Sequence, residues 1–215
     1  MAFTGPCMAL VPARDFRMGK SRLAPALDED MRAELSRWML ERVLNTLNEV
    51  RGIDEIAVLS DGDGALSLGE ALGAERIRCS ARDMNADLEL GRGWALERGA
   101  RWLLIVHGDL PALEPSEVEA MLDSAAGGSG GCAVLMPSVD GGTNGILLGP
   151  PGALPFAFGP GSFKRHLDSA RAQNLQTVRF ESPGFRLDVD TLSDLSTFLE
   201  MDVPVPGWLS ALSHS

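Results

Sequence analysis

The sequence predicts an α/β protein of three layers (α/β/α), in which helices cover both faces of a mainly parallel sheet. Short apolar runs alternate along the chain with segments of helical periodicity, as successive βα units require. The clearest run, residues 102–106, contains no polar residue, which is typical of a strand buried on both faces, and Pro111 prevents its ladder from continuing. No Pro/Ser/Gly linker separates two apolar patterns, so we expect one domain over residues 1–201 and a tail at residues 202–215.

The first half of the chain begins with an expected strand at residues 8–11 and a basic loop at residues 12–25. A long helix should follow, because Asp28 can cap it and apolar residues recur near helical spacing until Gly52. The remaining elements expected here are strands at residues 56–59 and 77–79, and helices at residues 66–72 and 88–96.

In the second half, the strand at residues 102–106 leads to a helix that starts near Ser116, and residues 127–131 form a flexible glycine turn. The other expected elements are strands at residues 132–136 and 146–148, a last strand ending at 187–189, and helices at 164–171 and 192–199.

The tail from Asp202 onward lacks periodicity, so we expect it to be mobile or to contact another subunit. Its large apolar residues either pack across a homodimer or fold back on their own subunit; they are Val203, Val205, Trp208 and Leu209.

Composition excludes several classes of protein. A formal net charge of −11 argues against a nucleic-acid polymer as partner, because such binding needs extended basic surfaces. No apolar run approaches the ~18 residues of a membrane span, and residues 1–8 carry no basic residue of an export signal. The widely spaced Cys7, Cys79 and Cys132 suggest reduced thiols, so we expect a soluble, cytoplasmic protein.

The loop after the first expected strand concentrates positive charge, with Arg14, Arg17, Lys20 and Arg22 within nine residues. Its Gly-Lys-Ser triplet is not a P-loop, because Arg14 stands where that motif needs glycine, and no GxGxxG indicates a dinucleotide-binding dehydrogenase. The loop can still hold a triphosphate, with Lys20 as a point charge and Arg14 or Arg22 as planar forks. The alternative is a solvated charge run.

Three aspartates are candidates for binding a metal ion. Asp109 follows the buried strand, where ligands of open α/β sheets bind, while Asp188 and Asp190 lie two apart in a strand-like LDVDT and should share one face. Carboxylates gathered at one edge need a cation, and Mg²⁺ prefers such oxygen ligands. The alternatives are a turn-forming Asp109, an exposed Asp188 and a helix-capping Asp190.

Glycine-rich segments offer anion sites. In FGPGSF, the amides of Gly159 and Gly161 and the hydroxyl of Ser162 come directly before an expected helix, where anions bind well. Turn and N-cap chemistry is the competing interpretation, and the GGTN segment at residues 141–144 has the same two interpretations. We expect His107 and His166 to be structural or peripheral, because neither belongs to a nucleophilic motif.

Taken in order, VPARDFRMGKSRLAP, SDGD, MNADL, HGDLPAL, GGTNGILL, PFAFGPGSFKRHL and LDVDTLSDL resemble the CofC/FbiD family, the guanylyltransferases of coenzyme F420 biosynthesis. The resemblance covers residues 8–199 and implies a nucleotide-diphospho-sugar transferase-like fold. It also implies Mg²⁺-dependent transfer of GMP from GTP to a small phosphorylated acid, with release of pyrophosphate. The acceptor implied is 2-phospho-L-lactate, phosphoenolpyruvate or 3-phospho-D-glycerate.

The resemblance assigns roles by motif, with Lys20 and Asp109 expected to act in catalysis. The metal ligands are Asp109, Asp188 and Asp190; the nucleotide contacts are Arg14, Lys20, Arg22, Ser60, Asp61 and Asn85; the acceptor contacts are Thr143, Gly159, Gly161 and Ser162.

This chain departs from the family pattern at three places. Arg14 replaces a lysine, His107 and Gly108 replace Pro-Ala before the DLP motif, and residues 138–139 lack a basic residue. Two alternatives therefore stay open: a non-catalytic nucleotide-sensing domain, and a cytidylyl or molybdopterin guanylyl transferase on the same fold.

Overall fold

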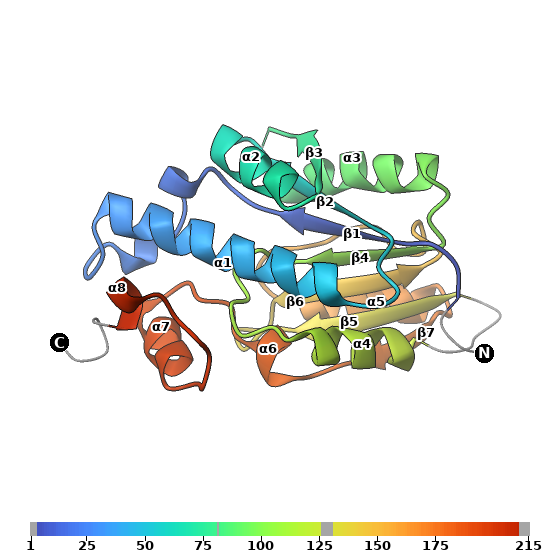
Figure 1. The fold of residues 1–215 in the computed structure, drawn as a ribbon. Coiled ribbons are helices and arrows are strands. Elements are labelled where there is room, and N and C mark those ends of the chain that lie inside the picture. The colour runs from blue at the N-terminus through green and yellow to red at the C-terminus, as the bar shows by residue number, and fades with distance from the viewer. Residues whose placement is uncertain (1–3, 81, 126–130, 211–215) are drawn as a thin grey trace.

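The computed structural model describes residues 4–80, 82–125 and 131–210, so the expected turn at residues 127–131 lies almost wholly outside the described residues. The described strands form one sheet of seven in the order β3-β2-β1-β4-β6-β5-β7 (Figure 1). The strands are β1 (Cys7–Pro12), β2 (Glu55–Ser60), β3 (Glu75–Arg78), β4 (Trp102–Val106), β5 (Cys132–Pro137), β6 (Thr143–Gly149) and β7 (Gln176–Arg179).

All pairings in the sheet are parallel except those of β6, which runs antiparallel to β4 and β5. The mainly parallel α/β sheet is therefore confirmed. Because β6 is reversed, its first residues, Thr143 and Asn144, lie at the same edge as the carboxyl end of β4, where Val106 pairs with Gly145.

Helices cover both faces of the sheet, as predicted. The helices are α1 (Glu29–Glu49), α2 (Asp63–Ala71), α3 (Met84–Glu97), α4 (Pro115–Ser124), α5 (Ser162–Ala172), α6 (Pro183–Arg186), α7 (Leu192–Leu199) and α8 (Gly207–Ser210). Alternate residues of β1 point to opposite faces, so Ala9 belongs to the core cluster that includes residues of α1, α2 and α4, and Leu10 to the cluster that includes residues of α3 and α5. Gly91 lets α3 approach closely, since a Cβ there would lie 2.6 Å from Leu10 Cδ1.

Local signals explain why α1 begins where it does. The Asp28 side chain accepts a hydrogen bond from the Met31 amide at 2.8 Å, which satisfies one of the unpaired donors of the first turn. The prediction of Asp28 as the N-cap is confirmed.

The expectation of a last strand ending at residues 187–189 is wrong. These residues are irregular, and the last strand is β7, which the sequence analysis missed. Strand β7 lies at the sheet edge and each of its residues is exposed or partly exposed, so it lacks the apolar run that marks a buried strand.

A third core cluster lies apart from the two faces of the sheet. It joins Leu23 of the basic loop, Ala112 after β4, Val189, and residues of α1, α7 and α8. Leu209 is fully buried in it, with Val203, Val205 and Trp208 packed against it, so residues 203–209 fold back on their own subunit (Figure 1). Among the described residues, no helix has the length and hydropathy of a membrane span.

Candidate active site

A cavity of about 550 Å³ opens at the carboxyl ends of β1 and β4. Parallel strands end at this edge, which is where ligands bind in open α/β sheets. The cavity is lined by the basic loop after β1, the turn after β4, the turn before β6 with the first residues of β6, the loop before α5 and the segment before α7. Residues of α1, β2 and α3 also line it. Residues distant in sequence therefore meet here.

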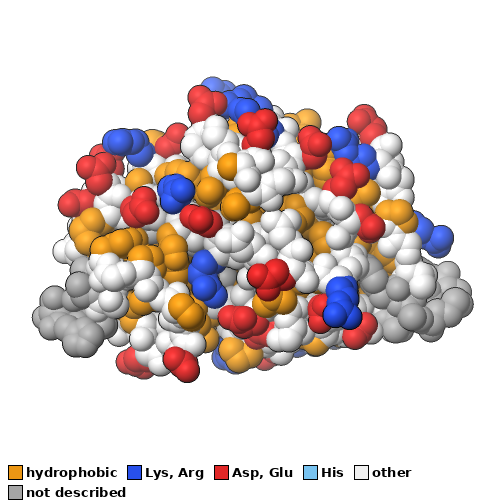
Figure 2. All heavy atoms as spheres, in the orientation of Figure 1, with side chains coloured by type: hydrophobic (Ala, Val, Ile, Leu, Met, Phe, Trp, Pro, Cys, Tyr) orange, Lys and Arg blue, Asp and Glu red, His pale blue; other side chains and the backbone are white. Residues whose placement is uncertain are grey.

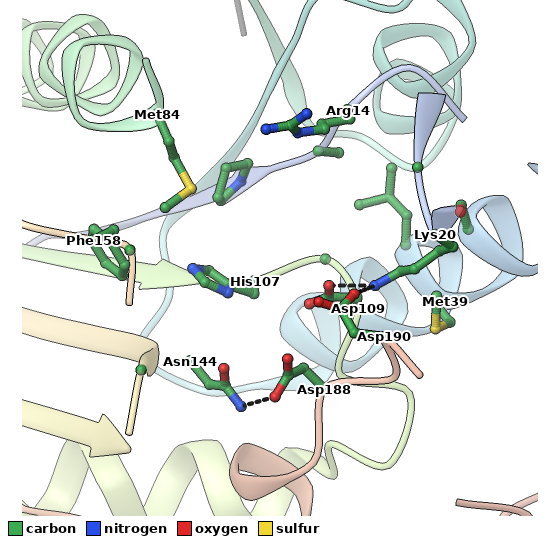
Figure 3. Close-up of a pocket in the computed structure, with 18 of the residues that line it drawn as sticks. Arg14, Lys20, Met39, Met84, His107, Asp109, Asn144, Phe158, Asp188 and Asp190 are labelled. Atoms are coloured by element: carbon green, nitrogen blue, oxygen red, sulfur yellow. Dashed lines mark hydrogen bonds and ion pairs between the residues drawn. The ribbon is translucent and has the colours of Figure 1, made fainter. Parts of the chain in front are cut away.

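Lys20 lies at the centre of the charged end of this cavity. Its Nζ is 2.6 Å from Asp109 Oδ2 and 2.6 Å from Asp190 Oδ1, and the side chain is 8% exposed (Figure 3). Burial alone would lower the pKa of Lys20, but the charges of Asp109 and Asp190 outweigh it and raise the pKa above its ordinary value. The ammonium group therefore stays charged between two carboxylates.

Asp109 is held as a carboxylate by its surroundings. Burial alone would raise the pKa of Asp109, but the charges of Lys20 and then His107 outweigh it and hold the pKa below its ordinary value. Its second oxygen, Oδ1, is buried and has no hydrogen-bond partner in the described part of the chain. A buried charged oxygen without a partner is costly, so this atom is available to a cation or a donor.

Asp188 lies near the same acids. Its Oδ1 accepts a hydrogen bond from Asn144 Nδ2 at 3.0 Å (Figure 3). Burial raises the pKa of Asp188, and the negative charges of Asp109 and Asp190 raise it further against the effect of the Asn144 hydrogen bond. The three predicted aspartates thus line one cavity, although Asp188 and Asp190 arrive there on irregular backbone rather than on a strand.

These residues fit a divalent cation. Three oxygen-bearing acids line one cavity, the buried Asp109 Oδ1 has no hydrogen-bond partner among described residues, and burial, followed by repulsion from Asp109 and Asp190, raises the pKa of Asp188. Over residues 4–80, 82–125 and 131–210, however, no three histidine, cysteine or acidic side chains form a ready-made metal cluster. In this structure the counter-charge is the ammonium of Lys20.

Two guanidinium groups line the cavity without ion pairs to described residues. Arg14 and Arg22 are both exposed on the cavity wall, while Arg17 pairs outside it with Glu29 and Asp30. On the face drawn in Figure 2, basic side chains are interspersed with acidic ones and do not merge into a continuous surface. Within the cavity, the positive charge that can meet an anion comes from Arg14 and Arg22, because Lys20 is already paired with Asp109 and Asp190.

The other end of the cavity is largely apolar. Met84 and Phe158 line it (Figure 3). Leu59, Leu88 and the buried Asp87 also line the cavity. Asp87 is anchored by Ser80, whose amide and hydroxyl lie 3.2 and 3.4 Å from its Oδ1.

Each of the three weaker nucleotide candidates makes a hydrogen bond to the backbone. Ser60 is buried and accepts from the Gly62 amide, and Asp61 accepts from the Asp15 amide at 3.1 Å. Asn85 makes two hydrogen bonds with the backbone of Phe158, at 2.7 and 3.2 Å. None of Ser60, Asp61 and Asn85 is among the described residues that line the cavity, so direct contact with a nucleotide stays a prediction for each.

The predicted acceptor contacts form a polar corner of the cavity. Thr143, Gly159 and Ser162 line it, whereas Gly161 caps α5 in the left-handed conformation with φ 68°. The hydroxyls of Thr143 and Ser162 lie 3.0 Å apart, and His166 contacts Thr143 from behind at 3.1 Å.

Three residues in or beside the cavity were not assigned a role from the sequence: His107 and Asp87 line it, and His166 contacts Thr143. His107 lines the cavity between Phe158 and the acids, and its Nε2 is buried with no partner among described residues (Figure 3). The position of His107 directly after a buried strand was the available signal, the same one that identified Asp109. Asp87 and His166 gave no comparable signal, because their motifs place them inside helices.

Comparison with known proteins agrees with this geometry. Residues 7–201 match the family described as guanylyl transferase CofC like. A phosphoenolpyruvate guanylyltransferase from Rubrobacter xylanophilus is 43% identical over 189 residues, 87% of this chain and 91% of the relative. A 2-phospho-L-lactate guanylyltransferase from Methanothermobacter thermautotrophicus is 30% identical over 192 residues, 89% of this chain and 83% of the relative.

The fold is also found among solved structures. A candidate nucleotide-diphospho-sugar transferase from Desulfovibrio desulfuricans G20 has a TM-score of 0.76 at 18% identity, covering 93% of this chain and 87% of that one. At this identity the similarity concerns the fold alone, and the predicted nucleotide-diphospho-sugar transferase-like fold is confirmed.

Proposed function

The chain belongs to the CofC-like family of guanylyl transferases, and on that premise we propose that it transfers GMP from GTP onto the phosphate of a small phosphorylated carboxylic acid. Pyrophosphate is the second product, and the step belongs to coenzyme F420 biosynthesis. Phosphoenolpyruvate is the first acceptor to test, because the relative at 43% identity is named for it. The alternatives are 2-phospho-L-lactate, for which a relative at 30% identity is named, and 3-phospho-D-glycerate.

The observation that carries this proposal is the charge arrangement of the cavity. Arg14 and Arg22 supply positive charge on the cavity wall, while Asp109, Asp188 and Asp190 supply oxygen ligands, two of them paired with Lys20. A triphosphate needs the first set, and a divalent cation bound to phosphates needs the second.

In the proposed reaction, an oxygen of the acceptor phosphate attacks the α-phosphorus of GTP in line. A bond forms between them, the bond from the α-phosphorus to the bridging oxygen breaks, and the electron pair leaves with pyrophosphate. The acceptor phosphate is largely ionised near neutral pH, so no side chain has to remove a proton. The protein acts by positioning the reactants and neutralising their charge.

Each part of the cavity has a task in this scheme. Arg14 and Arg22 bind phosphate oxygens of GTP, and Lys20 neutralises charge near the acids. The Thr143 and Ser162 hydroxyls orient the acceptor. Asp109, Asp188 and Asp190 would hold Mg²⁺, which when bound supplies charge neutralisation between the phosphoryl groups.

Replacing Asp109 by asparagine tests the assignment. We expect Asp109→Asn to lower the rate of pyrophosphate release by roughly two to three orders of magnitude, the usual cost of removing one electrostatic contact to a transition state. The matched control is Asp168→Asn on the exposed face of α5, which should keep full activity. Thermal unfolding of both variants checks that the fold survives.

The same assay separates the alternatives. Near-normal turnover and normal magnesium dependence in Asp109→Asn would contradict the role of this residue. GTP binding without pyrophosphate release for any of the three acids would indicate a nucleotide-sensing domain, and preference for CTP would indicate a cytidylyltransferase. Turnover with molybdopterin in place of the acids would indicate the other guanylyl transfer.

A further inference from the structure

The polar corner of the cavity is connected to a buried imidazole that does not itself line the cavity. His166, on α5, is fully buried. Its Nε2 accepts a hydrogen bond from the Ala157 amide at 3.0 Å, and its Nδ1 lies 3.1 Å from Thr143 Oγ1. Ser162 Oγ lies 3.0 Å from the same Thr143 oxygen. These contacts form one chain from the loop before α5 to the cavity wall.

The proton positions in this chain follow from its contacts. A backbone N–H can only donate, so Ala157 occupies the lone pair of Nε2, and a neutral imidazole must then carry its single proton on Nδ1. Burial, with a smaller contribution from the charge of Arg165, lowers the pKa of His166 to about 4, so the ring is neutral at pH 7. His166 therefore donates to Thr143.

The two hydroxyls then have one proton more than they use. Thr143 and Ser162 each carry one hydroxyl proton, and a single hydrogen bond joins the two oxygens. If Ser162 donates to Thr143, the Thr143 proton is left over; if the bond runs the other way, the Ser162 proton is left over. Neither hydroxyl has another partner among the described residues, and both side chains line the cavity.

From this proton count we propose that His166 is a positioning residue that makes the Thr143–Ser162 hydroxyl pair a donor toward an anionic oxygen of the acidic substrate. The inference rests on the proposed function and extends it to a residue outside the cavity. If the imidazole accepted at Nδ1 instead, the spare proton would point at His166 and the pair would offer the cavity only lone pairs, which repel an anion. Helix α5 begins at Ser162, but the amides of Ser162 and Phe163 already donate to the carbonyls of Gly159 and Gly141, so the hydroxyl pair is the donor left at this corner.

A purely structural role is the competing explanation. The His166 ring packs against Phe158 with centroids 4.9 Å apart, and Phe158 also lines the cavity. Loss of His166 could thus disturb the cavity through packing alone. The test must therefore separate donation to Thr143 from the presence of the ring.

Two substitutions make this separation. Glutamine can reach the Nε2 position and accept from Ala157, but it places no donor at the Nδ1 position; asparagine can place its amide nitrogen near Nδ1. We expect His166→Gln to weaken binding of phosphoenolpyruvate by about tenfold, because the hydroxyl pair keeps its spare proton but loses the donor that directs this proton toward the cavity. His166→Asn should stay within about threefold of the natural protein, and GTP affinity should change less than about twofold in both variants.

A double-mutant cycle supplies the decisive readout. In the Thr143→Val, Ser162→Ala background, His166→Gln should cause no further loss, because no hydroxyl remains to be directed. An undiminished loss in that background, an equal loss of GTP and phosphoenolpyruvate affinity, or an Asn variant as weak as the Gln variant would each overturn the proposal. Affinity is measured by calorimetry on folded full-length protein, and thermal midpoints verify folding.

Separate probes show whether the hydroxyl pair binds the phosphoryl group or the carboxylate of the acid. They also allow the inference about His166 to be tested even if the proposed function is wrong. Inorganic phosphate and pyruvate are titrated beside phosphoenolpyruvate: a His166-dependent affinity for phosphate assigns the contact to the phosphoryl group, and one for pyruvate assigns it to the carboxylate. Absence of pyrophosphate release from the natural protein would refute the proposed function. The dependence of anion affinity on His166 can still be measured in that case, and its absence for all three probes would refute the present inference.

Discussion

The buried His166 makes a quantitative prediction about stability and pH. Its pKa is about 4 in the folded protein against an ordinary value of 6.5, because burial disfavours the charged ring. Between these two pH values His166 is protonated in the unfolded chain but not in the folded protein. The stability that depends on the neutral ring is therefore complete at neutral pH and is lost as the pH falls. From the two pKa values, the loss attributable to His166 is about 2 kcal/mol at about pH 5 and about 3 kcal/mol at about pH 4.

The assay is urea unfolding of the natural protein and His166→Asn over a series of pH values. The variant lacks the titrating ring, so the difference in free energy of unfolding between the two proteins should shrink by about 2 kcal/mol from neutral pH to about pH 5. Other groups cancel in this difference. Asp188, whose pKa is raised, opposes the loss equally in both proteins, and Asp109, whose pKa is lowered, acts below its ordinary value of 3.8. A difference that stays constant over the range would refute the reasoning.

Three further changes have expected outcomes. Asp28→Ala removes the cap of α1 and should lower the free energy of unfolding by about 1 kcal/mol in urea; no change would show that the cap contributes nothing. Asn85→Ala removes both hydrogen bonds to the Phe158 backbone and should raise the KM for the phosphorylated acid up to about tenfold, whereas a rise confined to the KM for GTP would support direct nucleotide contact instead. Leu209→Ala should cost about 2 to 4 kcal/mol in urea unfolding, and a change in solution mass without that cost would assign Leu209 to a subunit contact.

The buried parts of the fold were predictable because their signals are local. The strand at residues 102–106 is an unbroken apolar run, and Asp28 precedes a helical pattern, so each identifies its element without knowledge of the rest of the chain. Strand β7 gave no such signal, because an edge strand keeps polar side chains in solvent. The LDVDT segment was wrongly predicted to be a strand. Its alternation of apolar and acidic residues also suits an irregular segment whose apolar residues enter the third core cluster.

The residues of the candidate site were predictable from the sequence, but the contacts between them were not. Asp109, Asp188, Asp190 and Lys20 follow from motif position, and all four line the cavity. Lys20 bonds to Asp109, which is 89 positions away in the sequence, and to Asp190, which is 170 positions away. No local sequence pattern encodes contacts between residues so far apart. The role of His166 depends on the Ala157 amide and on Thr143, and such three-body hydrogen bonding is visible only in the folded protein.

The third core cluster has a consequence for biosynthesis of the protein. Leu23, Ala112, Val189 and Leu209 belong to this one small cluster, and the first three flank the segments that carry Lys20, Asp109, Asp188 and Asp190. During translation the sheet can begin to assemble as soon as its strands emerge, but Val189 and Leu209 are synthesised after β7, the last described strand of the sheet. A nascent chain that stops before them would thus hold an ordered sheet whose lysine and acids have no common support, and it would be a substrate for quality-control proteases rather than a slow enzyme.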